Sequence, residues 1–151
     1  MSDSVANAVT FSSVFEHGVD EKRRVQIPAK WRPRDPETEL TVMLWGKNDA
    51  VCLRVLPPAQ FQKLRDKIEA MPGSKEKVSR LRNLGANSEQ VTVDKVGRIC
   101  VPDRMAKAAG IADKATLVGL FEKFEIWNPQ RYEPVAAADA IIASGDLDSL
   151  E

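Results

Sequence analysis

Val93–Met105 reads Val-Asp-Lys-Val-Gly-Arg-Ile-Cys-Val-Pro-Asp-Arg-Met, and a similar stretch lies 74 residues earlier in the chain. That earlier stretch, Val19–Arg32, reads Val-Asp-Glu-Lys-Arg-Arg-Val-Gln-Ile-Pro-Ala-Lys-Trp-Arg. Six positions match without a gap, namely Val19 with Val93, Asp20 with Asp94, Arg24 with Arg98, Val25 with Ile99, Ile27 with Val101 and Pro28 with Pro102. A repeat of this length predicts two copies of one supersecondary unit.

The repeated unit is predicted to be a tight turn between two strands, followed by a short helix. The carboxylate of Asp94 can accept hydrogen bonds from backbone amides further along the turn, and Gly97 can adopt a positive φ without steric cost. Ile99 and Val101 alternate with polar neighbours, which is typical of a half-buried strand. Pro102 ends that strand and suits the first turn of a helix.

The repeat divides the chain into five predicted segments. Each copy, at roughly sixty residues, would bury too little apolar surface alone, so we expect both copies to share one core. The segments are a flexible N-terminal extension (1–10), a first repeat (11–56), a helical connector (57–89), a second repeat (90–133), and a C-terminal helix with an acidic tail (134–151).

Several element boundaries follow from local patterns. The first strand is expected to start at 11–15, and the closing hairpin of the second repeat at 115–119 and 124–127. In the connector, a helix after Pro58 is followed by one that ends before Gly85, with Val78 turned inward. These two helices suit either an amphipathic cover over the core or a basic nucleic-acid element. A last helix is expected to be interrupted at Pro134.

The charge is unevenly distributed, although the formal net charge of the 151 residues is zero. Residues 20–107 carry 19 basic and 12 acidic side chains, and the two ends supply the balancing negative charge. Such a division favours a body that faces a polyanion, although a solvated charged surface gives the same pattern.

The sequence contains no recognisable catalytic set, phosphate-binding glycine loop or metal-ligand spacing, which predicts a protein without enzyme activity, metal or cofactor. His17 is the only histidine and is expected to be structural. Cys52 and Cys100 lack ligand-like spacing and are expected to be reduced strand residues. The chain has no signal peptide pattern and no apolar run long enough to cross a membrane, which predicts a cytosolic protein.

Five cations in or beside the two turns are the candidate functional residues: Lys22, Arg23, Arg24, Lys95 and Arg98. An arginine can bond two acceptors of guanine at once, whereas a lysine is a point contact for phosphate. Alternatively, Arg24 and Arg98 pair with carboxylates inside the fold. The carboxylates of Asp20 and Asp94 are expected to form the turns, together with Gly97, rather than to serve as acid and base.

The Asp-x-x-Gly-Arg turn followed by hydrophobic, any, hydrophobic, Pro resembles the SpoVT/AbrB DNA-binding domains. Two such copies, with Phe-Glu-Ile-Trp at 124–127, resemble the MraZ family over about residues 11–133. The resemblance implies an α+β fold: an AbrB-type swapped-hairpin β-barrel made from two internal repeats in one chain, with covering helices.

The same resemblance implies a function. It predicts a nucleoid-associated, sequence-specific transcriptional regulator that forms a ring-shaped homo-oligomer and binds double-stranded DNA at short direct repeats upstream of its own division and cell-wall gene cluster. The Arg-bearing turns would face the DNA. The alternative is an antitoxin-like or scaffold protein that uses the same barrel mainly to bind a protein partner.

The first copy departs from the motif because Arg23 stands where the second copy has Gly97. An L-residue in the left-handed region costs on the order of 1–2 kcal/mol. Either the first turn bends differently, or it keeps the family geometry under strain and gains a third consecutive cation next to Lys22 and Arg24.

Overall fold

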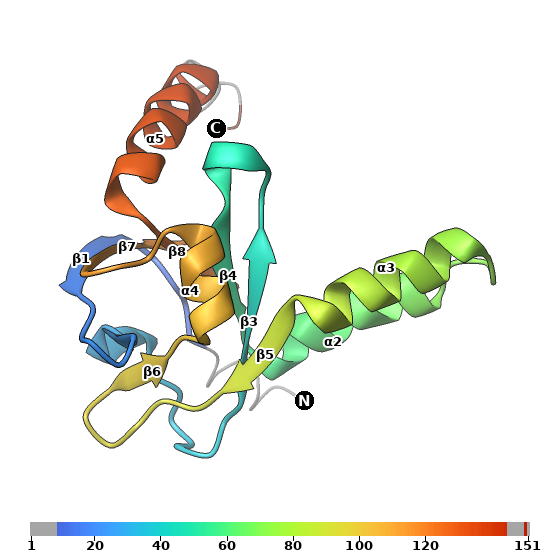
Figure 1. Ribbon diagram of the computed structural model, residues 1–151, viewed down its shortest axis with the longest axis horizontal. Coiled ribbons are helices and arrows are strands. Elements are labelled where there is room, and N and C mark those ends of the chain that lie inside the picture. Colours follow the sequence, from blue (N-terminus) through green and yellow to red (C-terminus); the bar gives the residue numbers. More distant parts are fainter. Residues whose placement is uncertain (1–8, 145–149, 151) are drawn as a thin grey trace.

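The computed structural model describes residues 9–144 and Leu150, and it has the expected α+β composition (Figure 1). The flexible extension expected at 1–10 and the acidic tail expected at 145–151 lie outside the described residues except at Val9, Thr10 and Leu150. The elements in chain order are β1 (Val14–Gly18), β2 (Arg24–Gln26), the 3-10 helix η1 (Ala29–Trp31), β3 (Leu40–Trp45), the 3-10 helix η2 (Asn48–Ala50), β4 (Cys52–Leu56), α2 (Pro58–Glu69), α3 (Lys75–Ala86), β5 (Ser88–Val91), β6 (Arg98–Cys100), α4 (Asp103–Ala109), β7 (Lys114–Gly119), β8 (Phe124–Trp127) and α5 (Pro129–Ala143).

Six strands form one sheet in the order β1-β7-β8-β4-β3-β5, and every neighbouring pair is antiparallel. The equivalent strands of the two repeats are β1 and β5, β3 and β7, and β4 and β8. When each strand is replaced by its equivalent and the order is read in reverse, the same order results. The first strand of each repeat pairs with the third strand of the other repeat, as β1 does with β7 and β5 with β3. The two repeats therefore share one sheet.

The remaining two strands, β2 and β6, form a separate antiparallel ribbon in which Val25 pairs with Ile99. Both of these side chains are fully buried, and they join the same hydrophobic cluster as Leu53 and Ile126 of the central strands β4 and β8. The ribbon thus closes one face of the six-stranded sheet. Alternation along its short strands turns the flanking residues Arg24 and Arg98 away from that core.

Aromatic side chains fill the part of the core beneath η1. Trp31 is 1% exposed, and its ring centroid lies 4.9 Å from that of Phe124 and 5.7 Å from that of Phe11. Trp31 belongs to the first repeat, and Phe124 lies in β8, the last strand of the second repeat. Their packing therefore holds the two repeats together.

The first strand begins later than expected. Phe11 forms only an isolated bridge with Phe121, and the regular strand starts at Val14. Ser13 lies between them with a φ of 84°, a conformation that interrupts a strand. The kink lets Phe11 enter the core, where it is 2% exposed.

The helical predictions need three corrections. Val78 is 49% exposed rather than turned inward, because α2 and α3 pack on each other as a hairpin that extends from the body and buries none of its residues (Figure 1). Gly85 lies inside α3, which continues to Ala86. Pro134 does not interrupt α5, which runs from Pro129 to Ala143 and gives up one backbone hydrogen bond at the proline.

Candidate nucleic-acid interface

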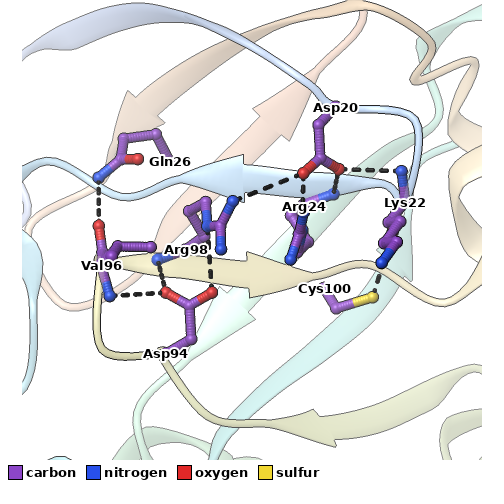
Figure 2. A network of polar contacts seen from close by, with 8 residues as sticks. All are labelled: Asp20, Lys22, Arg24, Gln26, Asp94, Val96, Arg98 and Cys100. Carbon is purple, nitrogen blue, oxygen red and sulfur yellow. Dashed lines mark hydrogen bonds and ion pairs between the residues drawn. The ribbon is translucent and has the colours of Figure 1, made fainter.

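The antiparallel β2–β6 ribbon carries the two predicted turns at its opposite ends (Figure 2). We refer to Asp20–Arg24 as the first turn and to Asp94–Arg98 as the second turn. Each turn precedes one strand of the ribbon, so the arginine that ends each turn is also the first residue of its strand. In the pairing register Arg24 lies opposite Cys100 and Arg98 lies opposite Gln26.

The second turn has the geometry expected from its sequence. Oδ1 of Asp94 accepts hydrogen bonds from the backbone amides of Val96 at 3.0 Å and Arg98 at 2.9 Å. Its Oδ2 accepts from Nε of Arg98 at 3.1 Å. The amide of Gly97 donates to the Asp94 carbonyl at 3.0 Å, and Gly97 has a φ of 88°. The aspartate therefore holds both the loop and the arginine.

The first turn repeats this arrangement. Oδ1 of Asp20 accepts from the amides of Lys22 at 3.0 Å and Arg24 at 2.9 Å, and Oδ2 accepts from Nε of Arg24 at 2.6 Å. The amide of Arg23 donates to the Asp20 carbonyl at 2.9 Å. Arg23 adopts a φ of 61°, so the first turn keeps the left-handed conformation that glycine provides in the second turn.

The side chain of Arg23 points back across the ribbon. Its Nε donates to the Val101 carbonyl at 3.2 Å, and its guanidinium lies 3.7 Å from the carboxylate of Asp103 at the start of α4. The pair is partly exposed, so it is worth little by itself. The hydrogen bond to the second repeat nevertheless offsets part of the conformational cost of a positive φ.

The second turn has a different neighbour at the equivalent place. The guanidinium of Arg32 occupies the space where a Cβ at Gly97 would lie, and its Nε donates to the Ile27 carbonyl at 2.9 Å. Gly97 thus adopts its positive φ without steric cost, and a Cβ at this position would displace the end of the Arg32 side chain. No local sequence signal indicates this role of Arg32, because its contact with Gly97 lies in the other repeat.

Symmetric backbone hydrogen bonds connect each turn to the other repeat. The amide of Ile27 donates to the Gly97 carbonyl at 2.8 Å, and the amide of Val101 donates to the Arg23 carbonyl at 2.9 Å. Nε2 of Gln26 also donates to the Val96 carbonyl at 3.0 Å (Figure 2). These bonds restrain the two loops relative to each other, as rigid presentation of their side chains requires.

Both candidate arginines are held by carboxylates, as the alternative interpretation anticipated. Beyond its own Asp94, Arg98 reaches across the ribbon to Oδ2 of Asp20 at 3.6 Å. The side chains of Arg24 and Arg98 keep 32% and 29% of their surface exposed. A guanidinium held through Nε by a carboxylate has a restrained orientation, so internal pairing and an outward contact are compatible.

The lysines are arranged less symmetrically than the arginines. Lys95 is the second residue of its turn and Lys22 the third, so the counterpart of Lys22 is Val96. Both lysine side chains are exposed. A shallow hollow of about 320 Å³ lies beside the first turn and the ribbon, lined by Gly18, Val19, Asp20, Arg24, Gln26 and Arg98.

Hydrogen bonding lowers the pKa of both turn carboxyls below their ordinary value near 3.8. For Asp20 the backbone amide of Arg24 is the main cause, partly offset by desolvation and assisted by the Arg24 side chain and the Lys22 amide. For Asp94 the backbone amide of Arg98 is the main cause, again partly offset by desolvation. Both groups are thus anionic at neutral pH, as turn-forming acceptors should be.

Other chemistry finds little support in the part of the chain that the structure describes. It contains no group of three or more His, Cys, Asp or Glu side chains that could hold a metal ion. Its helices are too short or too polar for any of them to span a bilayer. What distinguishes the molecule is the pair of turns, which forms a cation-bearing surface built from two equivalent loops.

Comparison with known proteins identifies the family. Residues 84–145 match a family model described as MraZ protein, antitoxin-like. The chain is 33% identical over 129 residues to the transcriptional regulator MraZ of Roseiflexus sp. (strain RS-1), covering 85% of this chain and 87% of that one. It is 34% identical over 135 residues to the protein of the same name from Rickettsia rickettsii (strain Sheila Smith), covering 88% and 91%. The chain belongs to the MraZ family.

Proposed function

We propose that this protein is a sequence-specific DNA-binding transcriptional regulator that reads DNA with its two turns. The observation that carries the proposal is the pair of arginines, Arg24 and Arg98, fixed by aspartates at equivalent positions of the ribbon. Each guanidinium would contact base edges, while Lys22, Arg23 and Lys95 would contact phosphates. The curated relatives carry the name of a transcriptional regulator, which supports the same function.

The interlaced strand order supports a finer proposal about the fold. We infer an AbrB-type swapped-hairpin barrel, in which the ribbon closes the sheet and the two repeats of one chain take the places of two separate chains. The repeats would span 11–56 and 90–133, joined by the connector 57–89 and followed by the segment 134–151. This arrangement brings both turns to one surface.

A homo-oligomeric ring acting in the cytoplasm, at the nucleoid, would suit an operator made of short direct repeats. Each subunit would bind one repeat weakly, and linkage within the ring would raise the effective concentration for the next contact. We therefore expect promoter DNA upstream of the protein's own division and cell-wall gene cluster to bind tightly only when it carries tandem boxes. A single box binding as tightly as three at the same salt concentration would contradict the multivalent arrangement.

Replacing both turn arginines tests the DNA role directly. Arg24→Ala with Arg98→Ala should abolish specific binding in a gel shift, because each bidentate contact is worth roughly 1–3 kcal/mol of base discrimination. A matched control, Arg65→Ala with Arg82→Ala, removes two exposed arginines from the helical hairpin and should leave specific binding in place. Circular dichroism checks the fold of both variants. A normal gel shift by the folded turn variant would remove the turns from DNA binding.

The antitoxin-like alternative has one specific observation in its favour, the wording of the matched family description. It predicts a protein partner and no preference for upstream DNA. Steep salt dependence separates the two candidates, because displacement of counterions by several Lys and Arg side chains weakens DNA binding as salt rises. A protein partner bound mainly through apolar contacts would show little of that dependence.

A further inference from the structure

A groove of about 340 Å³ lies between α2 and the face of the six-stranded sheet that points away from the ribbon. Leu53 and Val55 of β4 are fully buried in the core that the ribbon closes, so Arg54 between them faces the opposite side. Gln60, Lys63, Leu64 and Lys67 of α2 form the other wall, at positions that share one helical face. This groove is therefore separate from the candidate DNA surface.

The groove combines an apolar floor with a cationic rim. Met43 and Leu56 are only 6% and 5% exposed, and Leu64 lies beside them. The lining contains Arg54, Lys63, Lys67, Lys123 and one carboxylate, Glu122. Arg54 is already paired with Glu125 at 2.8 Å, so the three lysines carry the excess positive charge. Such a surface suits a ligand that is both acidic and apolar.

Two large aromatic side chains are exposed at this groove or next to it. Trp45 is 42% exposed, with the guanidinium of Arg54 at 3.8 Å from its ring centroid. Phe121 is 67% exposed and precedes the groove residues Glu122 and Lys123. Phe121 also has a φ of 67°, a costly conformation for a bulky residue, and such strain tends to collect at binding sites.

The C-terminal segment 141–151 has the complementary properties. Among the exposed large apolar side chains of the described residues, its Leu150, Ile141 and Ile142 are the three most exposed, at 79%, 75% and 71%. The same segment contains three carboxylate residues, Asp146, Asp148 and Glu151, and no lysine or arginine. It is thus an acidic peptide with apolar side chains.

We infer that the groove binds the C-terminal segment 141–151 of a second copy of this chain. Charge complementarity supports the pairing, since the groove lysines Lys63, Lys67 and Lys123 would meet three carboxylates, and the exposed apolar groups of each side would cover those of the other. The occupant comes from another copy because Ile141, Ile142 and Leu150 are largely exposed here and so are not seated on their own chain.

The contact joins two different surfaces. In a pair of copies, the groove of one copy and the C-terminal segment of the other therefore stay free for further contacts. Heterologous contacts of this kind propagate into a ring when the rotation between copies closes, and into an open chain when it does not. The inference rests on the self-association in the proposed function and does not depend on DNA binding.

Charge exchange tests the contact in the full chain. One variant reverses the groove with Lys63→Glu, Lys67→Glu and Lys123→Glu, and a second reverses the segment with Asp146→Lys, Asp148→Lys and Glu151→Lys. Each variant alone should fall in light scattering toward the 16.7 kDa of a single chain. An equimolar mixture should recover the mass of the unmodified protein, because each reversed surface then meets an opposite charge.

A matched control reverses three exposed cations of the helical hairpin outside the groove, Arg65→Glu, Lys75→Glu and Arg82→Glu, and should keep the unmodified mass. Unmodified mass in either single variant, or no recovery in the mixture, overturns the inference. Because the measurement contains no DNA, a failed gel shift would contradict the DNA-binding proposal and leave this inference intact.

A truncated chain covers the possibility that a triple variant does not fold. Ending the chain after Ser144 removes none of the core residues among those that the structure describes, and it should also lower the mass. A synthetic peptide of residues 141–151 should then change the fluorescence of exposed Trp45, and the change should disappear after Lys63→Glu and Lys67→Glu. An unchanged signal with the intact groove contradicts the inference.

Discussion

The first and second turns have the same backbone conformation, but a different arginine packs at the left-handed residue of each turn. In the second turn a glycine takes the left-handed conformation, and Arg32 of the first repeat covers it. In the first turn Arg23 takes that conformation itself, and its own guanidinium bonds the Val101 carbonyl. The missing glycine therefore changes the source of the covering arginine and leaves the shape of the loop unchanged.

The exchange is reciprocal. With the offset of 74 residues between the copies, the counterpart of Arg32 is Ala106, which is 2% exposed at the base of α4. Arg32 bonds the Ile27 carbonyl, and Arg23 bonds that of the equivalent Val101. Each turn is therefore packed by one guanidinium, from Arg32 at the second turn and from Arg23 at the first.

Converting the second turn into the first should have the largest effect. Gly97→Arg places a side chain where the guanidinium of Arg32 lies and forces an L-residue into a positive φ. We expect a loss of about 2–4 kcal/mol in the free energy of unfolding, measured by urea denaturation.

The companion substitution is Arg32→Ala, which recreates the combination of Arg23 and Ala106. Alone it should cost about 1 kcal/mol through its lost hydrogen bond to Ile27. Combined with Gly97→Arg it should recover part of the lost stability, with a coupling energy of about 1–3 kcal/mol. Purely additive losses would mean that the two turns are not interchangeable.

This reciprocity also indicates where sequence reasoning succeeds and where it stops. The alternating pattern predicted that Val25, Ile27, Ile99 and Val101 face the core, and all four are fully buried. Periodicity works there because a residue's own strand determines which way it points. The contact between Arg32 and Gly97 joins two repeats, and no local pattern contains that information.

The misplaced elements have the same explanation. Val78 fits an inward stripe in sequence, but α3 packs mainly along α2 and leaves Val78 exposed. A helical stripe predicts a face and not a partner. Phe11 looks like part of a strand, but a backbone reversal at Ser13 sends it into the core. The sequence predicts the turn-forming role of Asp20 and Asp94, whose hydrogen bonds stay within five residues.

Asp20 and Asp94 should differ by a smaller amount in how much each contributes to the loss of stability in acid. Their pKa values are lowered in the folded state, so the stability they add is fully present above the ordinary value near 3.8 and is lost as the pH falls below it. The melting temperature should therefore drop in this acid range. Asp20→Asn should flatten that drop more than Asp94→Asn, because Oδ2 of Asp20 has cations at 2.6 Å and 3.6 Å. Equal flattening would mean that the cross-ribbon contact of Arg98 adds nothing.

Arg23→Gly should have the smallest effect, because its consequences nearly cancel. Removing the side chain relieves roughly 1–2 kcal/mol of conformational cost. It also removes the hydrogen bond to Val101, worth about 0.5–1.5 kcal/mol, and adds backbone entropy to the unfolded chain. We expect the free energy of unfolding to change by less than about 1 kcal/mol in urea denaturation.

Arg23→Ala keeps the positive φ and loses the contact, so it should be less stable than Arg23→Gly by about 1 kcal/mol. If the alanine variant were as stable as the glycine variant, the left-handed conformation would cost nothing at this position. The shared geometry of the two turns would then not explain why the second turn uses glycine. In the same variants, the slope of DNA affinity against salt should fall by about 0.9 if the Arg23 guanidinium reaches a phosphate, and should not change if it serves only Val101 and Asp103.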